Sequence, residues 1–420
     1  MNITLLGAAR FPSPLRRWVD DSERIPASIV RTVDARPEDS LLFEVAGARE
    51  KLFFNPLETC AGIVTCGGLC PGLNDVIRSL FFEMHHAYGV QKVLGFRWGY
   101  QGLDPEHGAE PLVLTHELVD RIHLQAGTIL GTSRGPVDKA RAVDNLIRRR
   151  VSILFAIGGD GTQRGAREFF EEAQRRGHAL SVVGIPKTID NDIPFVARSF
   201  GFLTAVQEAA RVLQRAHTEA RSVQNGIALV KLMGRHAGFL TAEATVASQD
   251  VNFTLIPEVP FQLEGEGGFL AALERRIVSR GHAVIAVAEG SGQELLGNTG
   301  NEHDTSGNVR LSDIGLFLQK KIEEWFNAQK IPFVMRYFDP SYIVRSSPDT
   351  NEDSILCDQF ARHAAHAAMA GKTGLVIGFL HDRFIHVPIE LLATGQKRLD
   401  PDSPAWSAVL AATRQPHRFQ

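Results

Sequence analysis

Short apolar runs alternate along the chain with segments in which apolar residues recur at helical spacing. Five mostly apolar runs of six or seven residues stand out, at 61–66, 151–157, 179–185, 226–232 and 282–288. After the first run, Leu73, Ile77, Leu80 and Met84 fall on one face of a predicted helix. Continuous apolar strands separated by helices are typical of parallel sheets that are buried on both faces. The pattern therefore predicts an α/β fold.

The second run is followed by a similar helix, which Gly177 ends; its apolar face carries Ala166, Phe169, Phe170 and Ala173. In open α/β sheets, ligands bind beyond the carboxyl ends of the strands. Glycines and charged residues of this sequence stand at five such ends, and they are Gly67, Gly68, Asp160, Asp190, Arg235 and Glu289. Because the placement recurs, we predict a ligand-binding cleft shared by two parallel sheets.

The composition excludes several classes of protein. With 420 residues, of which 44% are hydrophobic and 22% charged, the chain is ordinary for a soluble globular protein of two or three domains. It has no apolar run of about 18 residues, so no membrane span is expected. Its first residues make a poor signal peptide, and a cytoplasmic location is expected. The net charge of -3 disfavours nucleic-acid binding.

Other segments are given structural interpretations. The cysteines form no CxxC pair, which favours reduced, partly buried thiols over a zinc site; they are Cys60, Cys66, Cys70 and Cys357. "HAAH" (363–366) has no carboxylate motif nearby, so a metal site there is disfavoured. "RRR" (148–150) ends a predicted helix, where cations complement the helix dipole. The polar segment 297–308 is expected to be a surface loop.

Two glycine turns carry the first candidate chemistry. "CGGLCPG" (66–72) joins a predicted strand to a helix, and its glycines let backbone N–H groups approach a phosphate, although such turns are also common without a ligand. In "GGDGT" (158–162), Gly159 and Gly161 leave room for a nucleotide, and Asp160 offers a hard oxygen ligand to a magnesium ion that bridges phosphates. The alternative is that Asp160 only caps the next helix.

The segment "PKTIDND" (186–192) is more specific. Asp190 and Asp192 alternate, so on an extended segment their side chains would point the same way. Two close carboxylates raise each other's pKa, unless cations hold them ionised. An ionised aspartate that faces a hydroxyl is the general base that a phosphoryl transfer needs. The alternative is an aspartate-rich turn with no ligand.

Three arginines and one glutamate complete the candidate set. Arg134 lies in "GTSRGP", Arg235 in "LMGRHAG" and Arg345 in "DPSYIVRS". The planar guanidinium group suits recognition of phosphate, but each arginine alone could equally lie on the surface or in an ion pair. Glu289, in "AEGSG" after a strand, could accept hydrogen bonds from a sugar.

Together these segments resemble the 6-phosphofructokinase family. The resemblance runs from about Cys60 to about Gly378, in the order "GGLCPGLND", "GTSRG", "GGDGT", "PKTIDND", "LMGRHAGF", "AEGSG" and "DPSYIVRS". Each motif alone is modest, but the ordered set is highly specific. The chain looks most like the longer ATP-using branch found in plants, trypanosomatids and some bacteria, which carries a lysine in "PKTIDND" and a tyrosine in "DPSYIVR".

The resemblance implies two doubly wound, largely parallel sheet domains, with the active site in the cleft between them. It places an N-terminal extension at 1–58, a nucleotide-binding domain at 59–201 and 344–395, and a sugar-phosphate-binding domain at 202–343 and 396–420. The implied reaction transfers the γ-phosphoryl group of MgATP to the C1 hydroxyl of fructose 6-phosphate in glycolysis. A homodimer or homotetramer under allosteric control is also implied, without the effector site of the short bacterial enzymes.

The family's roles carry over where the motifs match. Asp190 would be the catalytic base, and Asp160 would bind the magnesium ion. The residues expected to hold ATP are Gly67, Gly68, Arg134, Gly135, Gly159, Asp160, Gly161, Thr162 and Lys187. The residues expected to hold fructose 6-phosphate are Thr188, Ile189, Asp190, Met233, Gly234, Arg235, Glu289, Tyr342, Ile343, Val344 and Arg345.

The sequence also departs from the family pattern. The short bacterial enzymes have an arginine at the position of Gly226, which reaches a neighbouring subunit's substrate, and a histidine at that of Tyr342. Arg310 is a candidate to compensate. Pyrophosphate-using relatives have an aspartate at the position of Gly161, so this glycine favours ATP as donor, whereas Lys187 suits either donor.

Three alternatives remain: a pyrophosphate-dependent phosphofructokinase, a kinase of another substrate class that shares "GGDGT", and a catalytically inactive regulatory homologue. "PKTIDND" and "MGR" speak against another class of kinase. Asp160 and Asp190, both present, speak against an inactive homologue.

Overall fold

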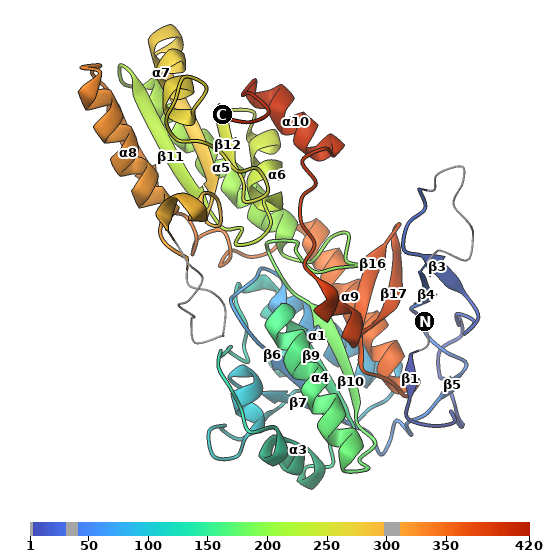
Figure 1. The fold of residues 1–420 in the computed structure, drawn as a ribbon. Helices are drawn as coiled ribbons and strands as arrows, with labels where there is room; N and C mark the ends of the chain where they lie inside the picture. Colours follow the sequence, from blue (N-terminus) through green and yellow to red (C-terminus); the bar gives the residue numbers. More distant parts are fainter. Residues whose placement is uncertain (1–2, 31–40, 298–310) are drawn as a thin grey trace. The chain divides into compact units, whose positions relative to one another are not determined.

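The computed structural model describes residues 3–30, 41–297 and 311–420, and its chain forms two compact units (Figure 1). Unit 1 comprises Met1–Thr188, Ile193–Gly201 and Ser346–Gly395; unit 2 comprises Ile189–Asp192, Phe202–Arg345 and Gln396–Gln420. Residues 189–192 and 344–345, expected in the nucleotide-binding domain, therefore group with unit 2. Arg310 and nearly all of the expected loop 297–308 lie outside the described residues.

Within the described ranges, unit 1 is built on a nine-stranded sheet. Its five central strands run parallel, and antiparallel strands close both edges. In spatial order the strands are β3 (Arg24–Pro26), β4 (Leu42–Val45), β17 (Arg383–Pro388), β16 (Leu375–Leu380), β10 (Ser181–Pro186), β9 (Ile153–Gly158), β6 (Cys60–Thr65), β7 (Lys92–Phe96) and β8 (Leu112–Val113). Every residue of β6, β9 and β10 is buried, as their apolar runs predict.

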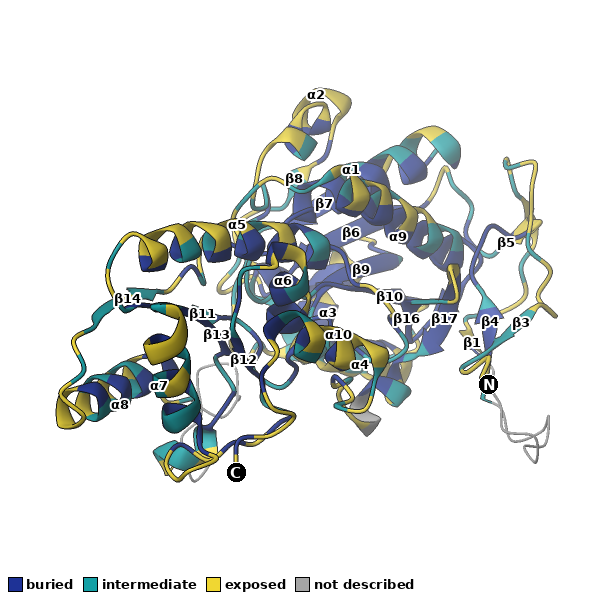
Figure 2. Ribbon diagram, turned by 90° about the horizontal axis from the view of Figure 1, so that it is seen from above, coloured by how far each residue is buried: buried dark blue, intermediate teal, exposed yellow. Residues whose placement is uncertain are grey.

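Helices cover both faces of this sheet, with α1 (Leu73–Phe82) and α9 (Asn351–Met369) on one face and α3 (Lys139–Arg148) and α4 (Asp160–Arg175) on the other (Figures 1 and 2). The predicted apolar faces are the buried ones; they comprise Leu73, Ile77, Leu80 and Met84, and Ala166, Phe169, Phe170 and Ala173. Met84 lies in a π-helical turn, η2 (Glu83–Ala87), that continues α1. Shorter helical elements are α2 (His116–Val119), η3 (Gly99–Leu103), η4 (Ile122–Leu124) and η6 (Ile389–Thr394).

The N-terminal segment is part of unit 1. Strands β3 and β4 extend the large sheet, β1 (Thr4–Leu5) pairs with β15 (Lys372–Thr373), and β2 (Phe11–Pro12) pairs with β5 (Lys51–Leu52). Phe43 and Leu52 are almost completely buried. The expected extension at 1–58 is thus integrated into the sheet and core of this unit.

The four strands described for unit 2 are all parallel, in the order β12 (Phe253–Leu255), β13 (His282–Ala288), β11 (Gly226–Leu232) and β14 (Val334–Phe338). The accompanying helices are α5 (Phe202–Arg221), α6 (Phe239–Ser248), α7 (Phe269–Arg280), α8 (Ile314–Ala328) and α10 (Pro404–Thr413), with the short η5 (Gln293–Leu296). Helices α5 and α6 lie on one face of the sheet, and α7 and α8 lie on the other (Figure 2). The predicted doubly wound α/β architecture is confirmed in each unit.

No helix in the described part of the chain is both long and apolar enough to span a membrane. All four cysteines are free of disulfides, and they are buried rather than partly buried as expected. His363 and His366 do lie on one helix, with ring centroids 5.9 Å apart. Burial lowers the pKa of His363 to about 4 and that of His366 to about 3, so both rings are neutral near pH 7.

Candidate active site

The expected nucleotide-binding turns of unit 1 lie side by side because their strands are neighbours. Strands β6, β9 and β10 are parallel and in register, with Thr65 opposite Ile157 and Pro186 opposite Gly158. Lys187, which is 5% exposed, follows β10 directly. Its backbone N–H donates to Gly158 O at 3.1 Å, and its ammonium group donates to Gly68 O at 2.7 Å. One lysine therefore connects three of the sequence motifs.

The segment "GTSRG" joins the same group of turns. Gly67 donates its N–H to Ser133 O at 3.2 Å, and the Thr132 hydroxyl donates to Gly67 O at 2.6 Å. Arg134 and Gly135 follow directly, and both are exposed. Gly135 has a φ of +114°, which favours glycine. Four motifs that span more than a hundred residues thus form one surface of backbone amides and cations.

Two glycines of "GGDGT" have different reasons to be glycine. A Cβ at Gly158 would lie 2.1 Å from the Thr162 hydroxyl oxygen, so packing alone requires glycine there. A Cβ at Gly161 would meet nothing nearer than the Arg164 guanidinium at 3.6 Å, and Gly161 is exposed in the first turn of α4. Glycine costs a helix about 1 kcal/mol relative to alanine. The fold does not require Gly161, so space left for a ligand is the better explanation.

Asp160 is the first residue of α4, and the N-cap position belongs to Gly159. No side chain caps this helix, so the helix-cap alternative for Asp160 does not describe this structure. The Asp160 carboxylate is 29% exposed and forms an ion pair with Arg164. Magnesium is commonly held by one or two carboxylates together with substrate phosphates and water. A partly exposed carboxylate at a helix N-terminus fits that need, with Arg164 as the group that a metal ion would displace.

The segment "PKTIDND" is extended only at its start, where Pro186 ends β10 and Lys187 forms a bridge with Phe200. The chain bends at Ile189 and Asp190, and Asn191 takes a left-handed conformation with φ of 54°. Asp190 and Asp192 therefore do not alternate as on a strand, because a left-handed residue between them reverses the backbone. Asp192 O accepts a hydrogen bond from Lys397 N at 2.9 Å, within unit 2.

At the carboxyl edge of the unit 2 sheet, two motifs are joined by their backbones. Strands β11 and β13 are parallel, with Leu232 opposite Ala288. Glu289 donates its N–H to Leu232 O at 2.9 Å, and Gly290 donates to Gly234 O at 3.1 Å. A Cβ at Gly290 would lie 1.9 Å from the carbonyl oxygen of Arg235, so this approach requires glycine. "MGR" and "AEGSG" thus form one loop surface.

The motif "DPSYIVRS" follows β14, the other neighbour of β11. Its turn is held by Ile343 N and Val344 N, which both donate to Pro340 O. Val344 is buried, whereas Tyr342 is 74% exposed. The Arg345 guanidinium lies 4.8 Å from the centroid of the Tyr342 ring. The side chain of Val344 packs inside the unit, that of Tyr342 is exposed, and Arg345 is partly buried.

Glu289 lies among cations of these same loops. Burial raises the pKa of its carboxyl, and Arg235, Lys231 and Arg345 oppose that rise. Glu289 is partly buried, and the positive charges of Arg235, Lys231 and Arg345 act on its carboxyl together with the negative charge of Asp339. Such a cluster has the composition expected of a site for an anionic sugar.

The structure explains one departure from the family pattern and adds one residue. A Cβ at Gly226 would lie 2.0 Å from Ala220 O, so no arginine can occupy this position without a backbone shift. Sequence analysis missed Lys231, which bonds to Asp313 and Asp339 next to the sugar-phosphate loops. The sequence does distinguish this residue, since Lys231 is the one charged residue in the apolar run 226–232.

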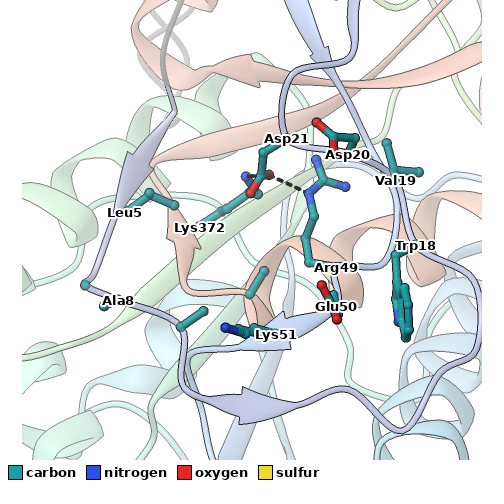
Figure 3. A pocket seen from close by; sticks show the side chains of 13 residues that line it. Leu5, Ala8, Trp18, Val19, Asp20, Asp21, Arg49, Glu50, Lys51 and Lys372 are labelled. Carbon is teal, nitrogen blue, oxygen red and sulfur yellow. Dashed lines mark hydrogen bonds and ion pairs between the residues drawn. The ribbon is translucent and has the colours of Figure 1, made fainter.

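One pocket of the N-terminal segment involves none of the expected site residues. It measures about 600 Å³ and is lined by residues that include Trp18, Asp21, Arg49 and Lys372 (Figure 3). The Arg49 guanidinium bonds to Asp21 at 2.7 Å, and the Lys372 ammonium lies 3.0 Å from the same carboxylate. Both cations also contact Glu44, at 2.8 Å from Arg49 and 2.6 Å from Lys372, so two carboxylates balance their charges.

Comparison with known proteins decides the family. A family model described as Phosphofructokinase matches residues 60–368. The chain belongs to the phosphofructokinase family. The resemblance drawn from the ordered motifs is thus confirmed, and the match begins at the residue where the motifs predicted it to begin.

Several curated family members are similar over nearly the whole chain. An ATP-dependent 6-phosphofructokinase of Borreliella burgdorferi is 46% identical, over 95% of this chain and 91% of its own length. ATP-dependent 6-phosphofructokinase 7 of Arabidopsis thaliana is 45% identical, over 97% and 85%. The ATP-dependent 6-phosphofructokinase of Trypanosoma cruzi is 46% identical, over 89% and 77%. These are the bacterial, plant and trypanosomatid groups that the motifs indicate.

Solved structures of the family share the fold. A pyrophosphate-dependent phosphofructokinase of Marinobacter aquaeolei superposes with a TM-score of 0.69 at 19% identity, covering 86% of this chain and 93% of its own. A Pichia pastoris phosphofructokinase gives 0.65 at 22% identity, covering 86% of this chain and 37% of its own. At these identities the likeness supports the phosphofructokinase fold and not the choice of phosphoryl donor.

Proposed function

We propose that this phosphofructokinase is an ATP-dependent 6-phosphofructokinase. It transfers the γ-phosphoryl group of MgATP to the C1 hydroxyl of fructose 6-phosphate, and the products are fructose 1,6-bisphosphate and ADP, as in glycolysis. The observation that carries the proposal is the 41–46% identity to curated enzymes of that name, over 88–100% of this chain. The geometry within each unit supports it.

In unit 1, the turns after β6 and β9 form the proposed ATP site. Backbone N–H groups at Gly68 and the start of α4 suit phosphate, because a helix N-terminus favours negative charge. The ammonium group of Lys187, which donates to Gly68 O, would stabilise the transferred phosphoryl group. Arg134 and Gly135 are exposed beside these turns and complete the surface.

Asp160 is the proposed magnesium ligand. A bound magnesium ion would neutralise charge on the β- and γ-phosphates. The contribution of the chain is one carboxylate oxygen at the N-terminus of α4, with Arg164 released from its ion pair with Asp160 when the metal arrives.

In unit 2, the proposed sugar-phosphate site comprises the loops after β11 and β13 and the turn after β14. Arg235 and Arg345 would bind the 6-phosphate, and Glu289 would accept hydrogen bonds from sugar hydroxyls. Asp190 would take the proton from the C1 hydroxyl as its oxygen bonds to the γ-phosphorus and the bond to ADP breaks. General-base catalysis of this kind typically contributes about 10²–10⁴-fold in rate.

The proposal of ATP rather than pyrophosphate as the phosphoryl donor rests on Gly161. Its position in α4 is open, and the fold gives no reason of its own for glycine there. The α-phosphate and nucleoside of ATP must pass close to this turn, and a carboxylate at position 161 would repel the α-phosphate. Pyrophosphate has no α-phosphate or nucleoside and would not reach this point. The test is a coupled assay of purified protein with fructose 6-phosphate, with ATP and pyrophosphate supplied in parallel. Brisk turnover with pyrophosphate and none with ATP would overturn the proposal.

The resemblance further supports a homodimer or homotetramer under allosteric control, in the cytoplasm. Light scattering of the purified protein tests the assembly. Cell fractionation tests the location, since two of the similar Arabidopsis enzymes are named chloroplastic.

A further inference from the structure

Lys231 is a charged residue in a strand whose other members are all buried. It is the penultimate residue of β11, two positions before Met233, and its side chain is 12% exposed. Its ammonium group lies 2.7 Å from Asp313 Oδ2 and 2.9 Å from Asp339 Oδ2. Although burial lowers the pKa of Lys231, the hydrogen bonds to the two carboxylates outweigh that effect and raise it. The side chain is therefore a permanent cation with two anionic partners.

Asp339 connects this cation to the "DPSYIVRS" turn. Its other carboxylate oxygen accepts a hydrogen bond from Ser341 N at 3.2 Å, which caps the start of the turn. The turn is then closed by Val344 N, which donates to Pro340 O at 3.1 Å. Lys231 thereby anchors, through Asp339, the turn that presents Tyr342 and Arg345.

Asp313 connects the same cation to the Glu289 loop. It is the N-cap of α8, where its Oδ1 accepts from Leu316 N at 3.1 Å. The neighbouring Ser312 O accepts a hydrogen bond from the Gln293 amide at 3.0 Å, and the same amide donates to Glu289 O at 2.9 Å. The start of α8 is thus tied to the loop that carries Glu289.

We propose that Lys231 is a positioning residue for fructose 6-phosphate, which holds the loop after β11, the turn after β14 and the Glu289 loop in one arrangement. The inference rests on the proposed function. Lys231 acts through Asp313 and Asp339 and does not bind the sugar phosphate itself, because its ammonium group is mostly buried and engaged by both carboxylates. Loss of the cation would leave two neighbouring carboxylates that repel each other, and the three loops would separate.

The test compares Lys231→Met with Lys320→Met, a matched change on α8 in the same unit, where the lysine side chain is 76% exposed. Coupled assays would give kcat and the KM values for fructose 6-phosphate and ATP. For Lys231→Met we expect KM for fructose 6-phosphate to rise at least tenfold and KM for ATP to stay within twofold. Lys231→Arg should restore most of the loss, and Lys320→Met should match the wild type.

A second variant keeps the inference testable if Lys231→Met does not fold. Asp339→Asn retains an oxygen that can accept from Ser341 N but removes the charge that pairs with Lys231. Like Lys231→Met, Asp339→Asn should raise KM for fructose 6-phosphate. An equal rise in both KM values, or no rise in either variant, would overturn the positioning role. Wild-type protein without activity on fructose 6-phosphate would instead refute the proposed function.

Discussion

Substitution of Gly161 by aspartate tests the choice of phosphoryl donor with little expected damage to the fold. A Cβ at this position is in open space, with the Arg164 guanidinium 3.6 Å away. Aspartate has a higher helix propensity than glycine, by about 0.3 kcal/mol. A carboxylate in the first turn adds about 0.3–1 kcal/mol of stability through the helix dipole. Gly161→Asp should therefore unfold at the wild-type temperature or above it.

The effect on ATP should be large because the new charge faces a phosphate. Two like charges about 4 Å apart repel by about 4 kcal/mol at an effective dielectric constant of about 20. Arg164 already pairs with Asp160 and is close enough to pair with the introduced carboxylate as well, which would cancel part of that repulsion. A net penalty of about 2–4 kcal/mol corresponds to a loss of about 30-fold to 10³-fold in kcat/KM for ATP.

The assay is coupled turnover with ATP and with pyrophosphate, alongside thermal unfolding of each variant. Gly161→Ala is the control, since it adds the Cβ and the helix propensity without the charge. We expect alanine to lose much less ATP activity than aspartate, and aspartate to retain or gain activity with pyrophosphate. If Gly161→Asp stayed within threefold of wild type for ATP while folded, the argument from repulsion would be wrong.

Four further predictions follow from the site and its surroundings. Asp190→Asn should lower kcat by about 10²–10⁴-fold with little change in KM; turnover within threefold of wild type would remove Asp190 as the base. Asp160→Ala should cripple turnover and raise the magnesium concentration for half-maximal activity, and an unchanged magnesium dependence would contradict a metal role. Arg235→Ala should raise KM for fructose 6-phosphate roughly tenfold to a hundredfold, from about 1.5–3 kcal/mol of charge-assisted bonding, and an equal effect on KM for ATP would count against direct binding. Burial and the neighbouring Asp349 raise the pKa of Asp75 to about 8. The wild-type protein therefore loses stability as the pH rises from about 4 to 8, because the folded state holds a proton on Asp75 that the unfolded state releases. Asp75→Asn should gain thermal stability relative to the wild type progressively across this range, and a difference in unfolding temperature that does not change with pH would refute the assignment.

Much of the candidate site follows from local patterns. The run 151–157 predicted a buried strand, and the turn after it carries Asp160 at the first position of α4. The order of the motifs alone was enough to indicate the family, which the match over residues 60–368 confirms. The residue roles stay predictions. The bend near Asn191 agrees with the alternative of a turn at this segment, because asparagine and aspartate tolerate the left-handed conformation; the same residues do not exclude an extended segment, so the sequence left both open.

The sequence by itself determined five buried strands (β6, β9, β10, β11 and β13) and the helices α1 and α4, because burial on one or both faces dictates a local period of apolar residues. Only the tertiary structure decided which segments meet. Thr4 pairs with Thr373, and Lys231 bonds to Asp313, 82 residues further along the chain. Such contacts depend on the spatial order of strands, which the whole core selects and no short pattern encodes. Gly226 is another example, because the collision that excludes a side chain there comes from the end of the preceding helix packed against the start of β11.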